Sequence, residues 1–185
     1  ANATTTDTAC WSIATLDFAQ TLSTPQLPSQ RFQCQAAHLA HPHALPNHEY
    51  VFLQANDSRH QLMHYNDLTK ALKPLYASDV DYLYHFDFDP QSARLAVFSR
   101  TQELKHQLTL LSLSGQVLSQ HLISPPSHTK DANDFYDHYW YANFTASGNE
   151  LLATVQGKLY QIDLDAADNA NLQATEIASP LTNLV

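Results

Sequence analysis

Short runs in which apolar and polar residues alternate recur along most of the chain, and turn residues bound each run. Four such runs follow one another at 84–88, 94–99, 107–114 and 116–123. A second set of four follows in the same order at 140–144, 150–155, 158–164 and 172–178. Because successive side chains of a strand point to opposite faces, this period of two predicts two units of four antiparallel strands each.

The two units are copies of one repeat. Phe88 and Leu95 match Phe144 and Leu151 at a constant offset of 56 positions. Gly148 falls at a predicted hairpin of the second copy, where glycine supplies the positive φ that tight hairpins often need. The repeat therefore includes both the strands and the turns between them.

A third copy precedes these two. YVFLQ (50–54) corresponds to LAVFS (95–99), and RHQL (59–62) matches KHQL (105–108). Periods of about 40 to 50 residues with several strands each are typical of β-propeller blades rather than of helical arrays. The sequence predicts an all-β, β-propeller-like fold of about three to four four-stranded antiparallel blades, in a ring that is either closed or incomplete.

We expect one propeller-like domain over residues 1–185. Within the first full blade, HPHALPNHE (41–49) is expected to form a long loop in place of the usual turn. The expected divisions are a partial blade at 11–36, blades at 37–76, 82–124 and 138–178, and the start of a further blade at 179–185.

Four stretches resemble elements of the WD-like repeats of TolB-type β-propellers: FDPQSARLAVFS, FTASGNELLATV, LYQIDL and PLTNLV. The resemblance covers residues 36–185. Such repeats occur in TolB, in the amino-terminal propellers of prolyl-oligopeptidase-like enzymes, and in extracytoplasmic parts of CadC-like membrane-anchored transcriptional regulators, which the chain resembles most in its length and its two cysteines. The resemblance implies a non-catalytic sensor domain that binds a protein or small ligand. A peptidase propeller fragment and a TolB-like interaction scaffold are the alternatives.

The composition of the chain limits the kinds of molecule that it is expected to bind. Hydrophobic residues make up 44% and charged residues 15%, which indicates a globular chain. The net charge of −9 and the lack of a basic run argue against nucleic-acid binding. No stretch approaches the roughly 20 apolar residues of a membrane span, so no membrane contact is expected in this region, although Ala1 leaves open a removed leader or anchor. A protein partner or a small ligand is expected, and a homodimer is left open.

Cys10 and Cys34 are the two cysteines of the chain. They lack the close paired spacing of a zinc site or a redox dithiol. Two readings stay open, a disulfide in an oxidising compartment or two buried thiols in the cytosol. We favour the disulfide, and with the family resemblance it predicts a periplasmic or other extracytoplasmic location.

The densest candidate surface is NDFYDHYWY (133–141), which leads into the first strand of the last blade. Aromatic side chains with polar tips are common at binding surfaces. The alternative is that Tyr139 and Tyr141 pack between blades while the rest of the segment covers a loop. The residues that we predict to contact a ligand or partner are Asp134, Phe135, Tyr136, His138 and Trp140.

Two further clusters, one of histidines and one of aspartates, contain side chains that can bind metal ions. His38, His41, His43 and His48 lie within eleven positions, but no cysteine or carboxylate cluster completes a ligand set, so we expect exposed loop residues. The aspartates of ASDVDYLYHFDFD lack a calcium-loop pattern, so we expect turn-capping or solvated roles. No metal and no cofactor is predicted.

Catalytic motifs are missing from the sequence. It contains no Gly-x-Ser-x-Gly segment and no cysteine near a histidine, and its three glycines form no phosphate-binding loop. Because catalysis needs a converging nucleophile, base and oxyanion donor, we predict that the domain is not an enzyme.

Overall fold

The computed structural model describes residues 14–15, 29–30, 38–56, 59–78, 81–125, 139–155, 157–165 and 171–177. In this part of the chain all regular structure is strand. Two short strands, β1 (Ala14–Thr15) and β2 (Ser29–Gln30), pair antiparallel near the start. Within the described residues, no helix has the length and apolar character to cross a membrane.

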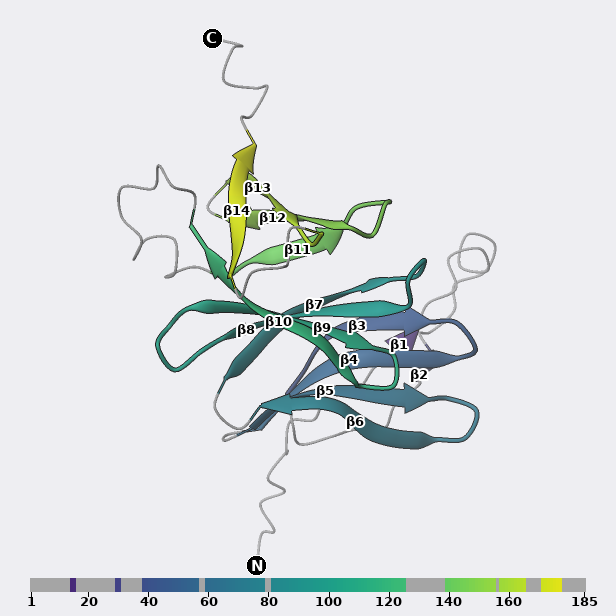
Figure 1. The fold of residues 1–185 in the computed structure, drawn as a ribbon. Helices are drawn as coiled ribbons and strands as arrows, with labels where there is room; N and C mark the ends of the chain where they lie inside the picture. Colours follow the sequence, from purple (N-terminus) through teal and green to yellow (C-terminus); the bar gives the residue numbers. More distant parts are fainter. Residues whose placement is uncertain are drawn as a thin grey trace, which may run out of the picture.

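Twelve longer strands form three meandering units of four, which Figure 1 shows one above another. Within each unit, every strand is antiparallel to its neighbour. This arrangement confirms the predicted all-β, propeller-like fold. The first blade contains β3 (His38–Leu45), β4 (Glu49–Asn56), β5 (Arg59–Asn66) and β6 (Ala71–Ser78); the second, β7 (Tyr82–Asp89), β8 (Arg94–Arg100), β9 (His106–Ser112) and β10 (Val117–Ser124); the third, β11 (Tyr141–Phe144), β12 (Glu150–Val155), β13 (Lys158–Asp163) and β14 (Asn171–Ile177).

Equivalent positions of the repeat occupy equivalent places. Phe88 pairs with Leu95 across β7 and β8, and Phe144 pairs with Leu151 across β11 and β12. Both leucines are fully buried. The matched residues, which are 56 positions apart, therefore share their place in the strand pairing as well as their residue type.

The hydrophobic core lies between the blades, because the middle blade is apolar on both faces. Leu95 and Val97 of β8 pack in a cluster with residues of the first blade. Ala96 and Phe98, which alternate with them, pack in a second cluster with residues of the third blade. All four are fully buried. Alternation along this one strand thus packs the middle blade against both of its neighbours.

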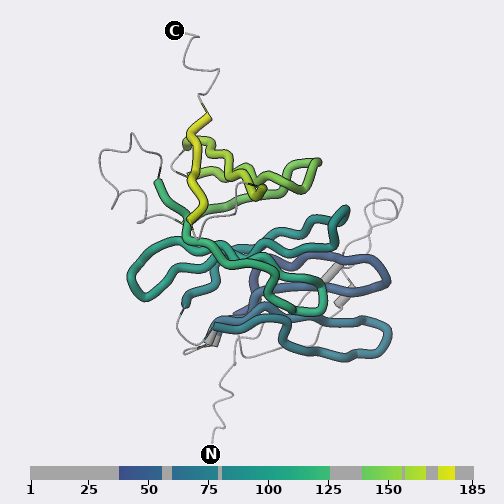
Figure 2. The backbone as a smooth tube through the Cα atoms, in the orientation of Figure 1, coloured from purple at the N-terminus to yellow at the C-terminus, as the bar shows by residue number. Residues whose placement is uncertain are grey.

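The second and third blades are joined at both edges. At the outer edge, the end of β10 pairs in parallel with the start of β14, so the two blades form one eight-stranded sheet (Figure 2). At the inner edge, the His85 Nε2 lies 2.8 Å from the carbonyl oxygen of Ala142. The backbone N–H of Phe144 donates to Asp87 Oδ2 at 2.7 Å.

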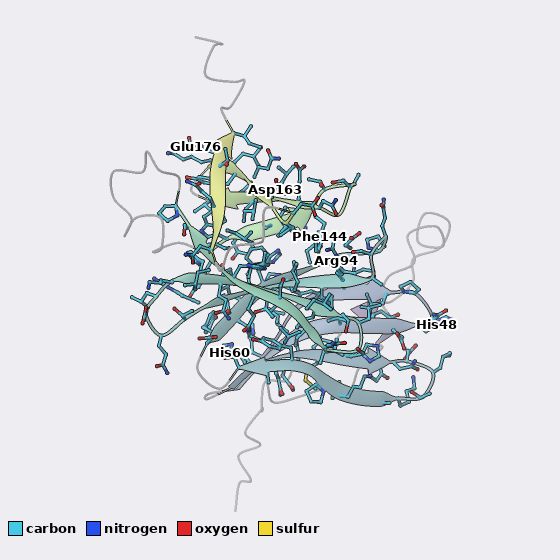
Figure 3. All side chains as sticks on the ribbon, viewed as in Figure 1. His48, His60, Arg94, Phe144, Asp163 and Glu176 are labelled. Atoms are coloured by element: carbon cyan, nitrogen blue, oxygen red, sulfur yellow. The ribbon has the colours of Figure 1, made fainter. Side chains whose placement is uncertain are left out.

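The hairpin between β7 and β8 is also linked to the hairpin between β11 and β12. Asp89 is 2% exposed and accepts hydrogen bonds from the N–H groups of Gln91 and Ser92 and from the Ser92 hydroxyl. Arg94 Nη2 donates to the carbonyl of Gly148 at 2.7 Å and lies 3.7 Å from Asp89 Oδ2. Figure 3 labels Arg94 at this junction. Asp89 therefore caps its turn, as the sequence suggested, and also borders the neighbouring blade.

The prediction of a loop over residues 41–49 is wrong. Residues His38–Leu45 form β3, and the turn covers only residues 46–48. Proline is tolerated here because β3 is the first strand of its sheet and hydrogen-bonds on one side only, to β4. His41 and Pro42 lie opposite the single residue Phe52, as in a β-bulge.

Candidate functional site

A cavity of about 200 Å³ lies where the first strands of the three blades begin. The starts of β3 and β7 and the segment entering β11 meet there, together with the end of β4 and the start of β5. Figure 3 labels His60, which contributes from β5. The lining residues are His38, Ala40, His41, Leu53, Ala55, His60, Tyr82, Leu83, Tyr84, Tyr139 and Tyr141.

Two of these inner strands are irregular beside the cavity. In β3 the register shifts between Ala40 and His43, and the intervening His41 has a φ of 52°. In β7 the register shifts between Leu83 and His85, which leaves Tyr84 as the extra residue. Bulges are frequent next to functional sites because they change the direction of one side chain without ending the strand. Here each bulge places a lining residue at the cavity.

Aromatic rings from all three blades touch one another along the cavity. His60 of the first blade lies 4.2 Å from Tyr82 of the second, between ring centroids. Tyr82 stacks on Tyr139 at 5.7 Å, and Tyr139 lies 4.9 Å from Tyr84. Three of the tyrosines stay open to solvent: Tyr82 is 45% exposed, Tyr139 is 42% exposed and Tyr141 is 51% exposed. The cavity mouth is therefore a half-exposed aromatic surface.

The cavity lining is rich in histidine and tyrosine. Its described residues include no aspartate, glutamate, lysine or arginine. Burial lowers the pKa of His41 and of His60, and a backbone hydrogen bond with Leu83 partly opposes the effect at His60. Burial raises the pKa of Tyr82 and of Tyr84. These imidazoles and phenols are thus neutral groups that can both donate and accept hydrogen bonds.

His85 does not line the cavity but lies next to two of its lining residues. It is 8% exposed, and its ring lies 5.3 Å from that of His41 and 5.5 Å from that of Tyr141. Its Nε2 is beside the Ala142 carbonyl, which can only accept, so Nε2 carries the proton. Burial also lowers the His85 pKa, so Nδ1 is a bare acceptor. Among the described residues, His85 Nδ1 has no hydrogen-bond partner.

Most of the predicted contact residues lie outside the described part of the chain: Asp134, Phe135, Tyr136 and His138. Trp140 is described and lies in the core, where it is fully buried 5.1 Å from the Tyr160 ring and 5.8 Å from the His106 ring. Its place in the structure is thus that of a packing residue.

The predicted Cys10–Cys34 disulfide also lies outside the described residues and stays a prediction. The histidines of the first blade separate. All three of His38, His41 and His43 are in β3. His38 and His41 line the cavity, whereas His43 contacts Phe88 of β7. Among the described residues, no group of three histidines, cysteines or acids is placed to hold a metal ion.

Sequence reasoning missed Tyr82 and Tyr84, although the repeat contained a signal for them. The pair Tyr139 and Tyr141 enters β11 with the same spacing of two that Tyr82 and Tyr84 show at the start of β7. The two pairs are 57 positions apart, one more than the repeat offset of 56, and a tyrosine pair near the start of the first strand in two blades predicts one shared surface. His60 carried no comparable signal, because it reaches the cavity through packing between blades.

Comparison with known proteins bears on the fold. No family model matches the chain, and no curated protein matches it. Among solved structures, it is similar to TolB from Acinetobacter baumannii, with a TM-score of 0.56, 12% identity, and coverage of 81% of this chain and 35% of that one. Prolyl oligopeptidase B from Galerina marginata gives 0.56 and 9% identity, covering 92% of this chain and 23% of that one.

An uncharacterized protein from Listeria monocytogenes EGD-e gives a TM-score of 0.51 and 11% identity, covering 72% of this chain and 38% of that one. The chain thus spans well under half the length of these three structures. At such identities the likeness concerns the fold alone. That fold is β-propeller-like.

Proposed function

We propose that this chain is a non-catalytic binding or sensor domain that works outside the cytoplasm. The observation that carries the proposal is the tyrosine- and histidine-lined cavity at the mouth where three blades converge. A pocket with a few convergent polar groups is the usual place for a ligand. The half-exposed rings around it also suit a protein partner.

More specifically, we propose that the domain is the periplasmic part of a membrane-anchored transcriptional regulator. The resemblance of its repeats to those of CadC-like regulators supports this. The signal would be a population shift, in which a ligand or partner favours one packing of the blades by binding it more tightly than the other. The junction of β3, β7 and β11 at the cavity suits such a role, because one bound molecule would contact all three blades.

A peptidase propeller fragment is the alternative, favoured by the likeness to prolyl oligopeptidase B over 92% of this chain. The coding sequence on either side separates the two. An upstream winged-helix segment with a transmembrane helix would support the regulator, and a downstream Gly-x-Ser-x-Gly segment would support the peptidase. A TolB-like scaffold would show neither. A homodimer stays part of this proposal, to be tested by sedimentation.

The site can be tested in the source cells by placing Tyr141→Ala in the chromosomal gene. We expect the transcript profile of this strain to match that of a strain lacking the gene, because the half-exposed Tyr141 borders the cavity. Leu72→Ala is the matched control, since Leu72 is 39% exposed on β6 and does not line the cavity.

A Tyr141→Ala strain with the wild-type profile would contradict the proposed site, and a gene deletion without effect on transcripts would contradict the regulator. Compartment is tested separately by protease treatment of cells with a permeabilised outer membrane. Digestion of this domain is expected, and its protection would contradict an extracytoplasmic location. Alkylation of Cys10 and Cys34 before and after reduction would test the predicted disulfide.

A further inference from the structure

We propose that the cavity between β3, β7 and β11 binds a small neutral ring compound that carries several hydroxyl groups, of the size of one sugar unit. This inference rests on the proposed function and specifies its ligand. Three properties of the described residues lead to it: the charge of the lining, its hydrogen-bonding groups, and its size and floor.

Charge excludes most ionic ligands. Among the described residues, no aspartate, glutamate, lysine or arginine lines the cavity. A buried ion without a counter-charge or hydrogen bonds is costly, so a ligand that leaves water for this site should be neutral. The nearby carboxylate of Asp87 already accepts the N–H of Phe144 from the next blade.

An organic cation could instead be held by open ring faces, as in an aromatic cage. The rings here do not form a cage. Tyr82 and Tyr139 stack with an interplanar angle of 29°, so each covers a face of the other. His60 lies 4.2 Å from Tyr82, and Tyr84 lies 4.9 Å from Tyr139. The row of rings offers polar tips and edges rather than a ring of free faces.

Hydrogen bonding favours a ligand with hydroxyl groups. Neutral imidazole and phenol groups each donate and accept, as a hydroxyl does, so a polyhydroxylated molecule matches them without ionisation. Buried acceptors normally have a donor, and His85 Nδ1 has none among the described residues. The His85 ring lies 5.3 Å from the His41 ring and 5.5 Å from the Tyr141 ring, between centroids. A ligand hydroxyl that reaches between these two side chains would satisfy it.

Size and floor favour a single ring. A volume of about 200 Å³ is below the range of about 300–1,000 Å³ that drug-sized ligands occupy. Leu53 and Leu83 add apolar surface beside the polar groups. The apolar face of a compact ring can lie on this surface while its hydroxyls meet the histidines and tyrosines.

A second cavity, of about 360 Å³, lies beside the loop between β8 and β9 and serves as an internal comparison. It includes Asp81, Glu103 and Lys105, and Lys105 Nζ lies 2.7 Å from Glu103 Oε2. No aromatic residue lines it. Because its chemistry is that of an exposed charged loop, a neutral polyol should not prefer it.

The test is saturation-transfer NMR on the purified chain. The neutral probes are methyl β-D-glucopyranoside, N-acetylglucosamine, galactose and myo-inositol, and the comparison probes are tetramethylammonium, phenol and acetate. We expect transfer to at least one neutral probe, with affinity about tenfold weaker in Tyr141→Ala, the upper end of what one aromatic contact supplies. Gln102→Ala, in the second cavity, should bind as the wild type does.

No transfer to any of the four neutral probes would overturn the proposal, as would binding that Tyr141→Ala leaves unchanged. If tetramethylammonium or phenol alone binds and depends on Tyr141, the ligand class is wrong while binding at this mouth is upheld. If a neutral probe binds here but the chromosomal variant has no effect on transcripts, the ligand class holds and the regulator proposal fails. A cooperative thermal transition in each variant, well above the temperature of the binding measurement, serves as the folding control.

Discussion

Replacing Gly148 by alanine tests how the second and third blades lock together. Gly148 has a φ of +73°, and a Cβ there would clash with Asp89 Oδ2. The carboxylate cannot move away freely, because it is buried and receives the N–H groups of Gln91 and Ser92. The substitution therefore combines backbone strain with displacement of a hydrogen-bonded carboxylate.

The magnitude follows from these two parts. A non-glycine residue in left-handed backbone costs about 1–2 kcal/mol. Loss of a hydrogen bond to the charged Asp89 costs about 1.5–3 kcal/mol more. We expect Gly148→Ala to lower the free energy of unfolding by about 2.5–5 kcal/mol. Gly157→Ala is the matched control, because Gly157 has a φ of +74° and its Cβ would have no heavy atom within 4 Å. Its expected loss is about 1–2 kcal/mol.

Urea unfolding of both variants, followed by circular dichroism, measures the difference from the transition midpoints at constant slope. Equal losses in Gly148→Ala and Gly157→Ala would refute the contact with Asp89. A double-mutant cycle sharpens the test. In an Asp89→Ala background, Gly148→Ala should cost only what Gly157→Ala costs, because the obstructing carboxylate is gone.

Two further predictions concern the histidines and the aromatic segment. Burial lowers the pKa of His41, His60 and His85 below the usual 6.5, so the unfolded chain binds more protons just below that pH. The contribution of these three histidines to the free energy of unfolding should be fully present above about pH 6.5 and should decrease as the pH drops towards 5. A urea midpoint that is the same at pH 7.5 and 5.5 would contradict this. Trp140→Ala should cost about 3–5 kcal/mol because the side chain is fully buried. Tyr141→Ala, half exposed, should cost less than about 1 kcal/mol; similar melting temperatures for the two variants would disprove this difference.

The strands and their order could be read from the sequence because both are local properties. The run ELLATV at 150–155 alternates, and it is β12 over the same residues. The offset between Phe88 and Phe144 predicted matching registers, which the pairing with Leu95 and Leu151 confirms. Alternation and turn chemistry act over a few residues, so no knowledge of distant contacts was needed.

Where local patterns were ambiguous, the sequence misled. Pro42 and three nearby histidines suggested a loop, but β3 continues through them as a bulged strand. Trp140 alternates with Tyr139 and Tyr141, which shows that it faces the other way. Alternation alone cannot say which side is the core, because blades such as the second are apolar on both faces.

By itself, the sequence determined the all-β class, the repeat and the four-stranded blade, since these follow from period-two patterning and turn residues. Only the tertiary structure decided the cavity. Its residues come from β3, β4, β5, β7 and the start of β11 with the residues before it, and packing between blades brings them together. The same packing buries His85 beside His41 and Tyr141. Burial and neighbours of this kind depend on contacts far apart in the chain, so the chemistry of the site appears only when the blades are stacked.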